Sequence, residues 1–358
     1  MNHRWSELLA SETITAAGTK LIDIDLGDPI SRITVLMKLT NNGSTPTAHP
    51  ALALTKAEII DGSDILASLT GYEMQALEFY HNGKTPYMDL IYLNNVMAIM
   101  ALSFDFGRFL HDTDLAFDPK RFKNPQIRLT HSLASGGSAP DSLDLRVRAD
   151  VFDDKIPAPM GFLSPKEIYS YSLVSSGNEY IDLPIDYPIR KLMIMSRAED
   201  KAPHEQFNLI KLSEESDKKV ILEAYTSDLY KIIAGDYPDW IDRIFGASSA
   251  SGVDHFVTPT LSPYPSINPE GIDNHVYPEA SHNGGTQKIY ATGGGNFFGI
   301  YSGRCPHGAI AIPMGDQNDP QDWWNTPGLT RARLKITAGS SVESSSTAQV
   351  VAQQFRPY

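Results

Sequence analysis

The sequence contains the same order of segments twice, and this repeat constrains the fold more than any single motif does. Residues 21–39 (LIDIDLGDPISRITVLMKL) align without a gap with residues 180–198 (YIDLPIDYPIRKLMIMSRA). Pro29 meets Pro188 in this alignment, an offset of 159 positions (188 − 29). Repeats of solenoid proteins are only about 20–50 residues long. The larger offset therefore indicates two copies of a whole domain.

Two further matches follow in the same order. Residues 63–86 match residues 216–238, and each segment has a tyrosine, a glycine and a proline at corresponding places. Each copy then ends in two strand-like segments joined by a Ser/Gly-rich loop: residues 127–130 and 147–152, then residues 334–337 and 350–355. Three matches in one order favour a duplicated domain. The alternative is that any two β-rich domains share short strand–turn–strand patterns.

The duplicated domain is predicted to consist mainly of antiparallel strands. Apolar and polar residues alternate in residues 32–39 and again in residues 143–151. A period of two buries one face of a strand and exposes the other, which is typical of antiparallel sheets. The short apolar run at residues 96–102 is interpreted as a buried strand. The sequence therefore predicts an all-β protein.

One short helix is expected at the same place in each copy. Thr70 and Glu73 form a capping-box pattern ahead of apolar residues at helical spacing, and Gly83 is placed to end the helix. In the second copy the same roles fall to Thr226 or Ser227 and to Gly235. A helix in a loop of this kind can cover the open end of a β-sandwich.

These patterns predict a first domain at residues 21–176 and a second at residues 177–358. The second domain is longer between its helix and its last two strands. The extra residues fall in a loop region at about 244–328 that is rich in Gly, Pro, Ser and Asn. Long insertions in loops are tolerated because the entropy cost of closing a loop grows slowly with its length. Such loops usually carry function or meet a partner.

Residues 1–20 precede the repeat and are expected to form an N-terminal arm. Trp5, Leu8 and Leu9 lie beside charged residues at a spacing that suits a short amphipathic helix. A disordered arm is an equally good interpretation of the same residues.

Composition argues against several classes of function. The net charge of −13 argues against a protein whose main task is to coat nucleic acid, so no sequence-specific nucleic-acid partner is expected. The single cysteine, Cys305, allows no disulfide within the chain, which is compatible with folding in a reducing compartment. The start of the sequence has no signal-peptide pattern. No apolar run reaches the roughly 18 residues that a membrane helix requires.

Two groups of aspartates are candidates for chemistry, and each has a simpler interpretation. Paired carboxylates for glycoside hydrolysis could come from Asp236, Asp239 and Asp242. Ligands spaced as in a calcium loop could come from Asp316, Asp319 and Asp322, although the glycine and the closing glutamate of such a loop are missing. Polar turns are the favoured interpretation of both groups.

Cys305 and His307 lie two residues apart, but a catalytic Cys–His pair requires proximity in space, and zinc needs more nitrogen or sulfur ligands. The glycine-rich segment Gly293–Gly299 lacks the GK[ST] ending of a phosphate loop. Ser135–Ser138 lacks the GxSxG pattern of a nucleophile elbow. None of these segments is predicted to be a catalytic, cofactor or metal site.

The remaining candidates are cations and tryptophans. Arg304, Arg331 and Arg333 are scattered in an acidic chain and are interpreted as solvated or interface residues. Trp323 and Trp324 could stack on sugars. A packed interface or a loop anchor is the favoured interpretation of this pair.

Two segments carry a resemblance to a known family. Ser63–Pro86 (SDILASLTGYEMQALEFYHNGKTP) and Phe106–Leu133 (FGRFLHDTDLAFDPKRFKNPQIRLTHSL) resemble segments of small phage coat proteins, with a helix, a strand, FGR and a proline-bounded strand. Together with the duplication, they make the chain similar to the double jelly-roll major capsid proteins. That lineage includes adenovirus hexon and the coat proteins of tailless, membrane-containing bacteriophages. The resemblance covers most of the chain as architecture and includes no invariant motif.

The resemblance implies two tandem eight-stranded antiparallel jelly rolls and no enzymatic activity, catalytic residue or cofactor. It implies a homotrimer that acts as a pseudo-hexagonal tile of an icosahedral shell, with neighbouring capsomers, penton and minor capsid proteins as partners. The chain would be made in the host cytoplasm and end in the virion. The loop region would face outward, and the arm would face inward towards any internal membrane. The alternative function is a carbohydrate-binding or glycan-hydrolysing protein on paired jelly rolls.

Overall fold

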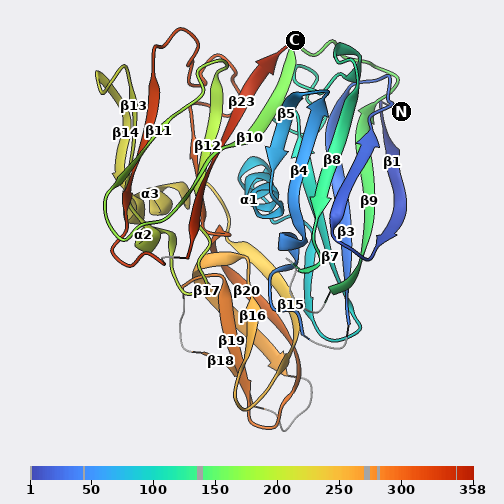
Figure 1. The fold of residues 1–358 in the computed structure, drawn as a ribbon, viewed down its shortest axis with the longest axis vertical. Coiled ribbons are helices and arrows are strands. Elements are labelled where there is room, and N and C mark those ends of the chain that lie inside the picture. The colour runs from blue at the N-terminus through green and yellow to red at the C-terminus, as the bar shows by residue number, and fades with distance from the viewer. Residues whose placement is uncertain (1, 43–44, 135–139, 270–274, 280–282, 344) are drawn as a thin grey trace.

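The computed structural model describes residues 2–42, 45–134, 140–269, 275–279, 283–343 and 345–358. Most of these residues lie in β-strands. The strands form two sandwiches side by side, with a smaller group of strands at one end (Figure 1). The prediction of an all-β protein is confirmed. No helix within the described ranges is long and apolar enough to cross a membrane.

The first sandwich has the strand order of a jelly roll. One sheet contains, in spatial order, β1 (His3–Ile14), β9 (Pro140–Phe152), β3 (Ile30–Asn41) and β7 (Met97–Asp105). The facing sheet contains β2 (Gly18–Asp23), β8 (Pro125–His131), β4 (Leu54–Asp61) and β5 (Asp64–Leu69). Neighbouring strands in both sheets are antiparallel. Ile33, Val35 and Met37 of β3 are fully buried, as the alternating pattern predicts.

The second sandwich repeats this order strand for strand. One sheet contains β10 (Gly161–Ser172), β23 (Thr347–Pro357), β12 (Ile189–Met195) and β21 (Ala309–Pro313). The other contains β11 (Asn178–Asp182), β22 (Ala332–Ala338), β13 (Phe207–Glu214) and β14 (Lys219–Tyr225). The matched sequence segments lie in corresponding strands: β2 and β11, β3 and β12, β5 and β14, β8 and β22, β9 and β23. The repeat in the sequence is therefore a repeat of the topology.

Two parallel strand contacts join the sandwiches. Ser68 of β5 pairs with Lys166 of β10, so that one eight-stranded sheet runs through both sandwiches. Leu90 of β6 (Met88–Tyr92) pairs with Ile244 of β15 (Trp240–Ser248). A continuous hydrophobic core extends through both sandwiches. The two copies therefore form one packed unit.

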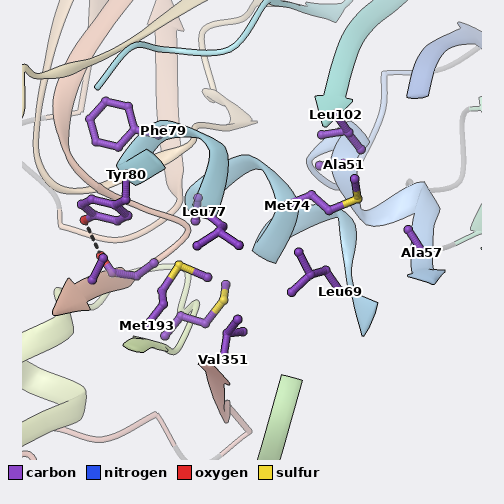
Figure 2. Close-up of a cluster of buried hydrophobic side chains, with 14 of the residues drawn as sticks. Ala51, Ala57, Leu69, Met74, Leu77, Phe79, Tyr80, Leu102, Met193 and Val351 are labelled. Carbon is purple, nitrogen blue, oxygen red and sulfur yellow. Dashed lines mark hydrogen bonds between the residues drawn. The ribbon is translucent and has the colours of Figure 1, made fainter. Parts of the chain in front are cut away.

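Helix α1 (Gly71–Asn82) begins and ends as its sequence predicts. Thr70 Oγ1 accepts a hydrogen bond from the Glu73 amide, and Glu73 Oε2 accepts one from the Thr70 amide. Gly83 ends the helix in the left-handed conformation, with φ of 62°. Leu77 of this helix lies in the same buried cluster as Met193 and Val351 of the second sandwich (Figure 2).

Helix α3 (Thr226–Ile233) takes the corresponding place in the second sandwich, but its predicted ends are wrong. Its N-cap is Tyr225, which makes no side-chain cap hydrogen bond, and Thr226 lies inside the helix. Its C-cap is Ala234 in the right-handed conformation, so Gly235 is not a left-handed stop. The reason is that β14 runs directly into the helix and leaves no Ser or Thr at the cap position. Shorter helical segments lie in other connections: α2 (Pro203–Gln206), Pro50–Ala53 and Pro119–Arg121.

The strands between α3 and β21 form a loop subdomain (residues 240–306) at one end of the molecule (Figure 1). β15, β20 (Gly295–Pro306) and β17 (Pro259–Pro269) continue a sheet of the first sandwich through β6. A separate small sheet contains β16 (Val253–Phe256), β19 (Thr286–Ala291) and β18 (Val276–Pro278). The predicted loop region at 244–328 extends too far, because Ala309–Pro313 is β21 and pairs with β12 in the second sandwich.

The first residues of the chain form strand β1, so the prediction of an amphipathic helix or a disordered arm is wrong. β1 pairs with β9 from His3, opposite Phe152, onward. Leu8 and Leu9 pack against the hydrophobic core. The pairing decides the conformation because β9 offers a long row of backbone hydrogen-bonding groups, a partner that local sequence does not reveal.

Strand pairing also bears on the boundary between the two domains. β10 pairs with β23 and β1 pairs with β9, so β10 holds the place in the second sandwich that β1 holds in the first. The predicted boundary after residue 176 would leave β10 in the first domain. We therefore propose that the boundary lies in the connection between β9 and β10, at residues 153–160.

Candidate functional site

Buried polar side chains gather where α1, the second sandwich and the loop subdomain meet; we call them the junction cluster. Arg197, which follows β12, donates to the main-chain oxygens of Val257 at 3.1 Å and Gly285 at 2.8 Å. Its Nη1 lies 3.1 Å from His307 Nδ1, and its guanidinium lies 5.1 Å from the centre of the Tyr72 ring. One cation thus ties the loop subdomain to α1 and to the second sandwich.

Two histidines complete the junction cluster. His307 Nε2 lies 2.7 Å from Gln75 Oε1, which only accepts, so Nε2 carries the proton and Nδ1 accepts from Arg197. His49 Nε2 lies 3.0 Å from Thr258 Oγ1. Burial lowers the pKa of both histidines well below the ordinary value, and the Arg197 cation adds to the effect. Both rings are therefore neutral at pH 7.

Asp242 of β15 fixes the loop subdomain from inside. Its side chain is fully buried. Oδ1 accepts from Trp240 Nε1 at 2.6 Å, and Oδ2 accepts from the Thr258 amide at 2.6 Å. Burial raises the pKa of Asp242 to about 6, and these hydrogen bonds oppose the rise. Both carboxylate oxygens are engaged by the chain itself.

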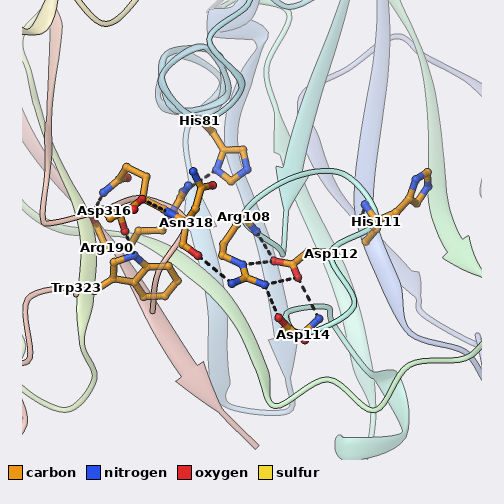
Figure 3. A network of polar contacts seen from close by, with 11 residues as sticks. His81, Arg108, His111, Asp112, Asp114, Arg190, Asp316, Asn318 and Trp323 are labelled. Carbon is orange, nitrogen blue, oxygen red and sulfur yellow. Dashed lines mark hydrogen bonds and ion pairs between the residues drawn. The ribbon is translucent and has the colours of Figure 1, made fainter. Parts of the chain in front are cut away.

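A second polar network joins the loop after β7 to the loop after β21 (Figure 3). Arg108 donates to both oxygens of Asp112, at 2.7 and 2.8 Å, and to Asp114 at 2.6 Å. It also donates to the main-chain oxygen of Asn318 at 2.9 Å. Asn318 belongs to the second sandwich and Arg108 to the first. The network is therefore a polar link between the two copies.

Two neighbouring cations of β12 are buried against the C-terminal end of α1. Lys191 Nζ donates to the main-chain oxygen of Tyr80. Arg190 Nη1 donates to Gln353 Oε1 at 2.8 Å and lies 3.0 Å from His81 Nδ1. Burial lowers the pKa of Arg190 to about 10 and that of Lys191 well below its ordinary value. The partial negative charge at a helix C-terminus compensates cations placed there, so this contact also holds the sandwiches together.

Side chains of the described clusters have partners within the chain itself. Burial raises the pKa of the Cys305 thiol to about 12, so the reactive thiolate is not formed near neutral pH. His307 is engaged by Gln75 and Arg197 and is not a base for this thiol. A groove of about 890 Å³ opens beside the junction cluster, but the His49 and Arg197 side chains in its lining already have partners within the chain. No group of three or more His, Cys, Asp or Glu among the described residues could hold a metal ion.

The aspartates considered for glycoside hydrolysis are not brought together around one open site. Asp242 is buried, whereas Asp239 is exposed and forms an ion pair with Arg304 at 3.1 Å. The Asp236 amide donates to the Ile233 main-chain oxygen in the turn after α3. These contacts support the simpler interpretation of the segment as a turn that leads into β15.

The aspartates considered for calcium binding stabilise their own turn. Asp316 accepts from the Asn318 amide at 2.8 Å, and Asp319 accepts from the Gln321 amide at 3.0 Å. Asp322 accepts from the Asp316 amide at 2.7 Å. The three carboxylates are used as backbone acceptors, as the turn interpretation predicts.

Trp323 and Trp324, the two tryptophans considered for sugar stacking, are buried anchors. Trp323 Nε1 donates to the Asp316 main-chain oxygen at 2.9 Å, and Trp324 Nε1 donates to Glu214 Oε1 at 2.7 Å. Arg331 and Arg333 both pair with a surface carboxylate, Asp182. The Gly293–Gly299 segment enters β20 and is not followed by a helix. Ser135–Ser138 lies outside the residues that the structure describes.

Sequence reasoning missed most residues of the two polar networks. His49 and Arg197 are single residues far apart in the chain, with no motif around them, so no local signal could have found them. The spacing of Arg108 and Asp112 gave no signal either, because the i+4 rule holds for helices and these residues lie in a loop.

No protein-family model matches the sequence, and no curated protein matches it. Solved structures do match. The STIV major capsid protein superposes with a TM-score of 0.63 and 9% identity, covering 99% of this chain and 97% of that one. The chain has the double jelly-roll fold. The major capsid protein P2 from bacteriophage PM2 has a TM-score of 0.55 and 11% identity, with 99% of this chain and 98% of that chain covered.

A structure of PBCV-1 VP54, fitted into a reconstruction of the virophage Sputnik, gives the same result. Its TM-score is 0.59 at 11% identity, over 99% of this chain and 94% of that chain. Because each match spans nearly the whole of both chains, the likeness includes both sandwiches and their relative placement. The double jelly-roll architecture that the sequence resemblance implies is thus confirmed, at 9–11% sequence identity.

Proposed function

We propose that this chain is a major capsid protein that builds the shell of a virion and has no enzymatic role. The observation that carries the proposal is the whole-chain match of the duplicated jelly roll to solved major capsid proteins. The site supports the same conclusion, because its buried polar groups bind the two sandwiches and the loop subdomain to one another. A rigid unit with two similar faces suits a building block of a shell.

The proposed assembly is a homotrimer that acts as a six-sided tile. Three chains supply six similar sandwiches around one axis, so each tile can meet neighbours in a near-hexagonal lattice. Its partners are other copies, neighbouring capsomers, and the penton and minor capsid proteins that close an icosahedral shell. Membrane contact through an N-terminal arm is not part of the proposal, since residues 3–14 form β1.

The loop subdomain is proposed to face outward. Both chain termini lie at the end of the molecule opposite this subdomain (Figure 1). Limited proteolysis of assembled particles tests this orientation and should cut first within residues 249–294. Cleavage confined to the first twenty residues would contradict it.

The oligomeric state of the purified chain tests the proposed function. Size-exclusion chromatography with light scattering should give the mass of three chains, and electron microscopy should reveal six-sided particles. A chain that stays monomeric at high concentration would contradict the proposal. The carbohydrate alternative finds no support in the described residues considered for it, because Trp323 and Trp324 are buried and the aspartates are dispersed.

A further inference from the structure

The junction inside the chain has a counterpart at its two outer edges. Within the chain, β5 of the first sandwich pairs with β10 of the second. The strand that corresponds to β5 in the second sandwich is β14, and the strand that corresponds to β10 in the first is β1. Both end their sheets among the described strands, and they lie on opposite sides of the molecule (Figure 1). The chain thus presents both halves of its own junction, unpaired, at opposite ends.

Strand pairing identifies the residue of β1 that corresponds to each residue of β10. Trp5 lies opposite Asp150, and Pro165 lies opposite Gln353. Asp150 and Gln353 hold the same place in the matched strands β9 and β23, at the offset of 203 that relates Val147 to Val350. Trp5 therefore corresponds to Pro165.

The helices give a second correspondence. α1 begins at Gly71 and α3 at Thr226, so the seventh helical residues are Leu77 and Ile232. Strand pairing agrees with this offset of 155 (226 − 71). Arg128 and Lys335, which hold the same place in β8 and β22, pair with Glu58 and Lys211, and these pair in turn with Ser68 and Glu223. The structural offset is two residues larger than the offset of 153 that relates Tyr72 to Tyr225 in the sequence (225 − 72). Leu77 therefore corresponds to Ile232.

Buried residues of the internal junction have exposed apolar counterparts at the outer edges. Leu77 and Pro165 line the same small cavity, and Leu77 is 6% exposed. Their counterparts are among the most exposed apolar side chains of the molecule: Ile232 is 68% exposed and Trp5 is 76% exposed. A single exposed apolar side chain is common on protein surfaces, but these two occupy positions whose counterparts are buried at the internal junction. Because Pro165 and Leu77 lie together at the internal junction, their counterparts Trp5 and Ile232 are expected to cover each other in a contact between two copies.

We propose that β1 of one copy docks beside β14 and α3 of the next copy, with Trp5 against Ile232 and Ser6 opposite Glu223. The last pair corresponds to Lys166 and Ser68 inside the chain. This inference rests on the proposed trimer and specifies its interface. A head-to-tail contact of this type uses two different surfaces, so it closes into a ring when the rotation per copy permits.

The contact between chains should be more polar than the junction within the chain. Met193 of β12 pairs with Val351 of β23 within the second sandwich, and both lie in the buried cluster that contains Leu77. They correspond to Thr34 and Arg148, which pair in the same way in the first sandwich. Arg148 lies only 3.8 Å from Glu7, and both side chains are partly exposed. A contact that includes such charges weakens as salt screens them.

Arginine substitutions at the two apolar positions test the interface. Trp5→Arg and Ile232→Arg should each reduce the mass in light scattering from three chains to one, at a concentration where the wild-type chain is a trimer. Both side chains are exposed in the single chain, so circular dichroism and the Tm of each monomer should stay close to wild type. Tyr264→Arg is the matched control, because Tyr264 is 69% exposed but lies in the loop subdomain. This control should remain a trimer.

Mixing the two variants gives a sharper test. Trp5→Arg keeps a functional β14 edge, and Ile232→Arg keeps a functional β1 edge. A head-to-tail contact therefore predicts a 1:1 heterodimer in the mixture that grows no further, whereas each variant alone stays monomeric. Mixed variants that remain monomeric would overturn the proposed pairing of these edges.

Cross-linking tests the register. Paired residues of neighbouring strands lie within disulfide range, and the native Cys305 is buried. The double variant Ser6→Cys with Glu223→Cys should give covalent species of two and three chains on oxidation, and neither single variant should give covalent trimers. If the wild type is a trimer but the arginine variants also are, and no cross-link forms, the interface is wrong and the capsid proposal stands. If the wild type never forms a trimer, the proposed function itself is contradicted.

Discussion

The Tyr80 hydroxyl of α1 donates a hydrogen bond to the main-chain oxygen of Ala309 in β21, at 2.8 Å (Figure 2). The two residues belong to different copies of the duplicated domain and are 229 positions apart in the chain. Tyr80 is buried, so the hydroxyl has no access to water. The helix of the first sandwich is thereby tied to a strand of the second.

Tyr80→Phe should destabilise the protein without changing its fold. The variant removes the donor and leaves a buried carbonyl with one partner fewer, which costs about 1–2 kcal/mol. Thermal unfolding followed by circular dichroism measures the effect as a lower Tm. Tyr264→Phe is the control, since Tyr264 is largely exposed, and its Tm should match the wild type. Equal Tm values for both variants would contradict a stabilising role of the Tyr80 contact.

Arg108→Ala should destabilise the protein more strongly. It leaves the Asp112 carboxylate, only 1% exposed, without its bidentate partner. The backbone amides of Arg108 and Asp114 still donate to this carboxylate, so the loss of the charged hydrogen bonds costs about 1.5–3 kcal/mol. Arg121→Ala is the matched control, because Arg121 and Asp118 form a more exposed pair, at 3.4 Å, worth about 0–1 kcal/mol. The double variant Arg108→Ala with Asp112→Asn should recover part of the loss in Tm.

Asp242 should make stability depend on pH between about 4 and 6. Burial raises its pKa to about 6, so the folded state binds a proton more tightly than the unfolded chain does. The resulting stabilisation is present below the unfolded pKa and is lost as pH rises through about 6. The shift corresponds to up to about 3 kcal/mol. Asp242→Asn lacks this pH-dependent stabilisation. The difference between the wild-type Tm and the variant Tm should therefore increase in favour of the wild type on acidification from pH 7 to 4. A difference in Tm that is constant across this range would contradict the assignment.

The buried histidines should have the opposite effect. Burial lowers the pKa of His49 and His307 well below the ordinary value, so the unfolded chain takes up protons first as pH falls below about 6.5. Their contribution to stability is therefore complete above that pH and is lost on acidification. His307→Gln should lose less Tm than the wild type between pH 7 and 5. The exposed His275→Gln should follow the wild type, and a His307→Gln profile parallel to wild type would count against the assignment.

Local patterns correctly predicted strands whose apolar residues recur at a fixed period and a helix whose capping residues are close in sequence. The capping box at Thr70 and Glu73 and the stop at Gly83 were predicted correctly because all their contacts lie within one helix. The start of α3 was predicted wrongly, because β14 leads directly into the helix at Thr226 and leaves no Ser or Thr at the cap position. The first strand was mistaken for an arm because its partner, β9, lies more than a hundred residues away. The junction cluster was invisible for the same reason, since Arg197 meets Val257, Gly285 and His307 only after folding.

The sequence by itself determined that the chain is a duplicated all-β protein, because strand alternation and repeated segment order are recorded in linear spacing. Linear spacing also records that Gly293–Gly299 lacks a GK[ST] ending and that the sequence contains no GxSxG pattern. Only the tertiary structure decided that residues 3–14 complete the first sandwich and that β5 and β10 join the copies. It also left Trp5 and Ile232 exposed on opposite edges. Strand pairing and burial depend on contacts between distant residues, and the linear spacing of residues does not specify those contacts.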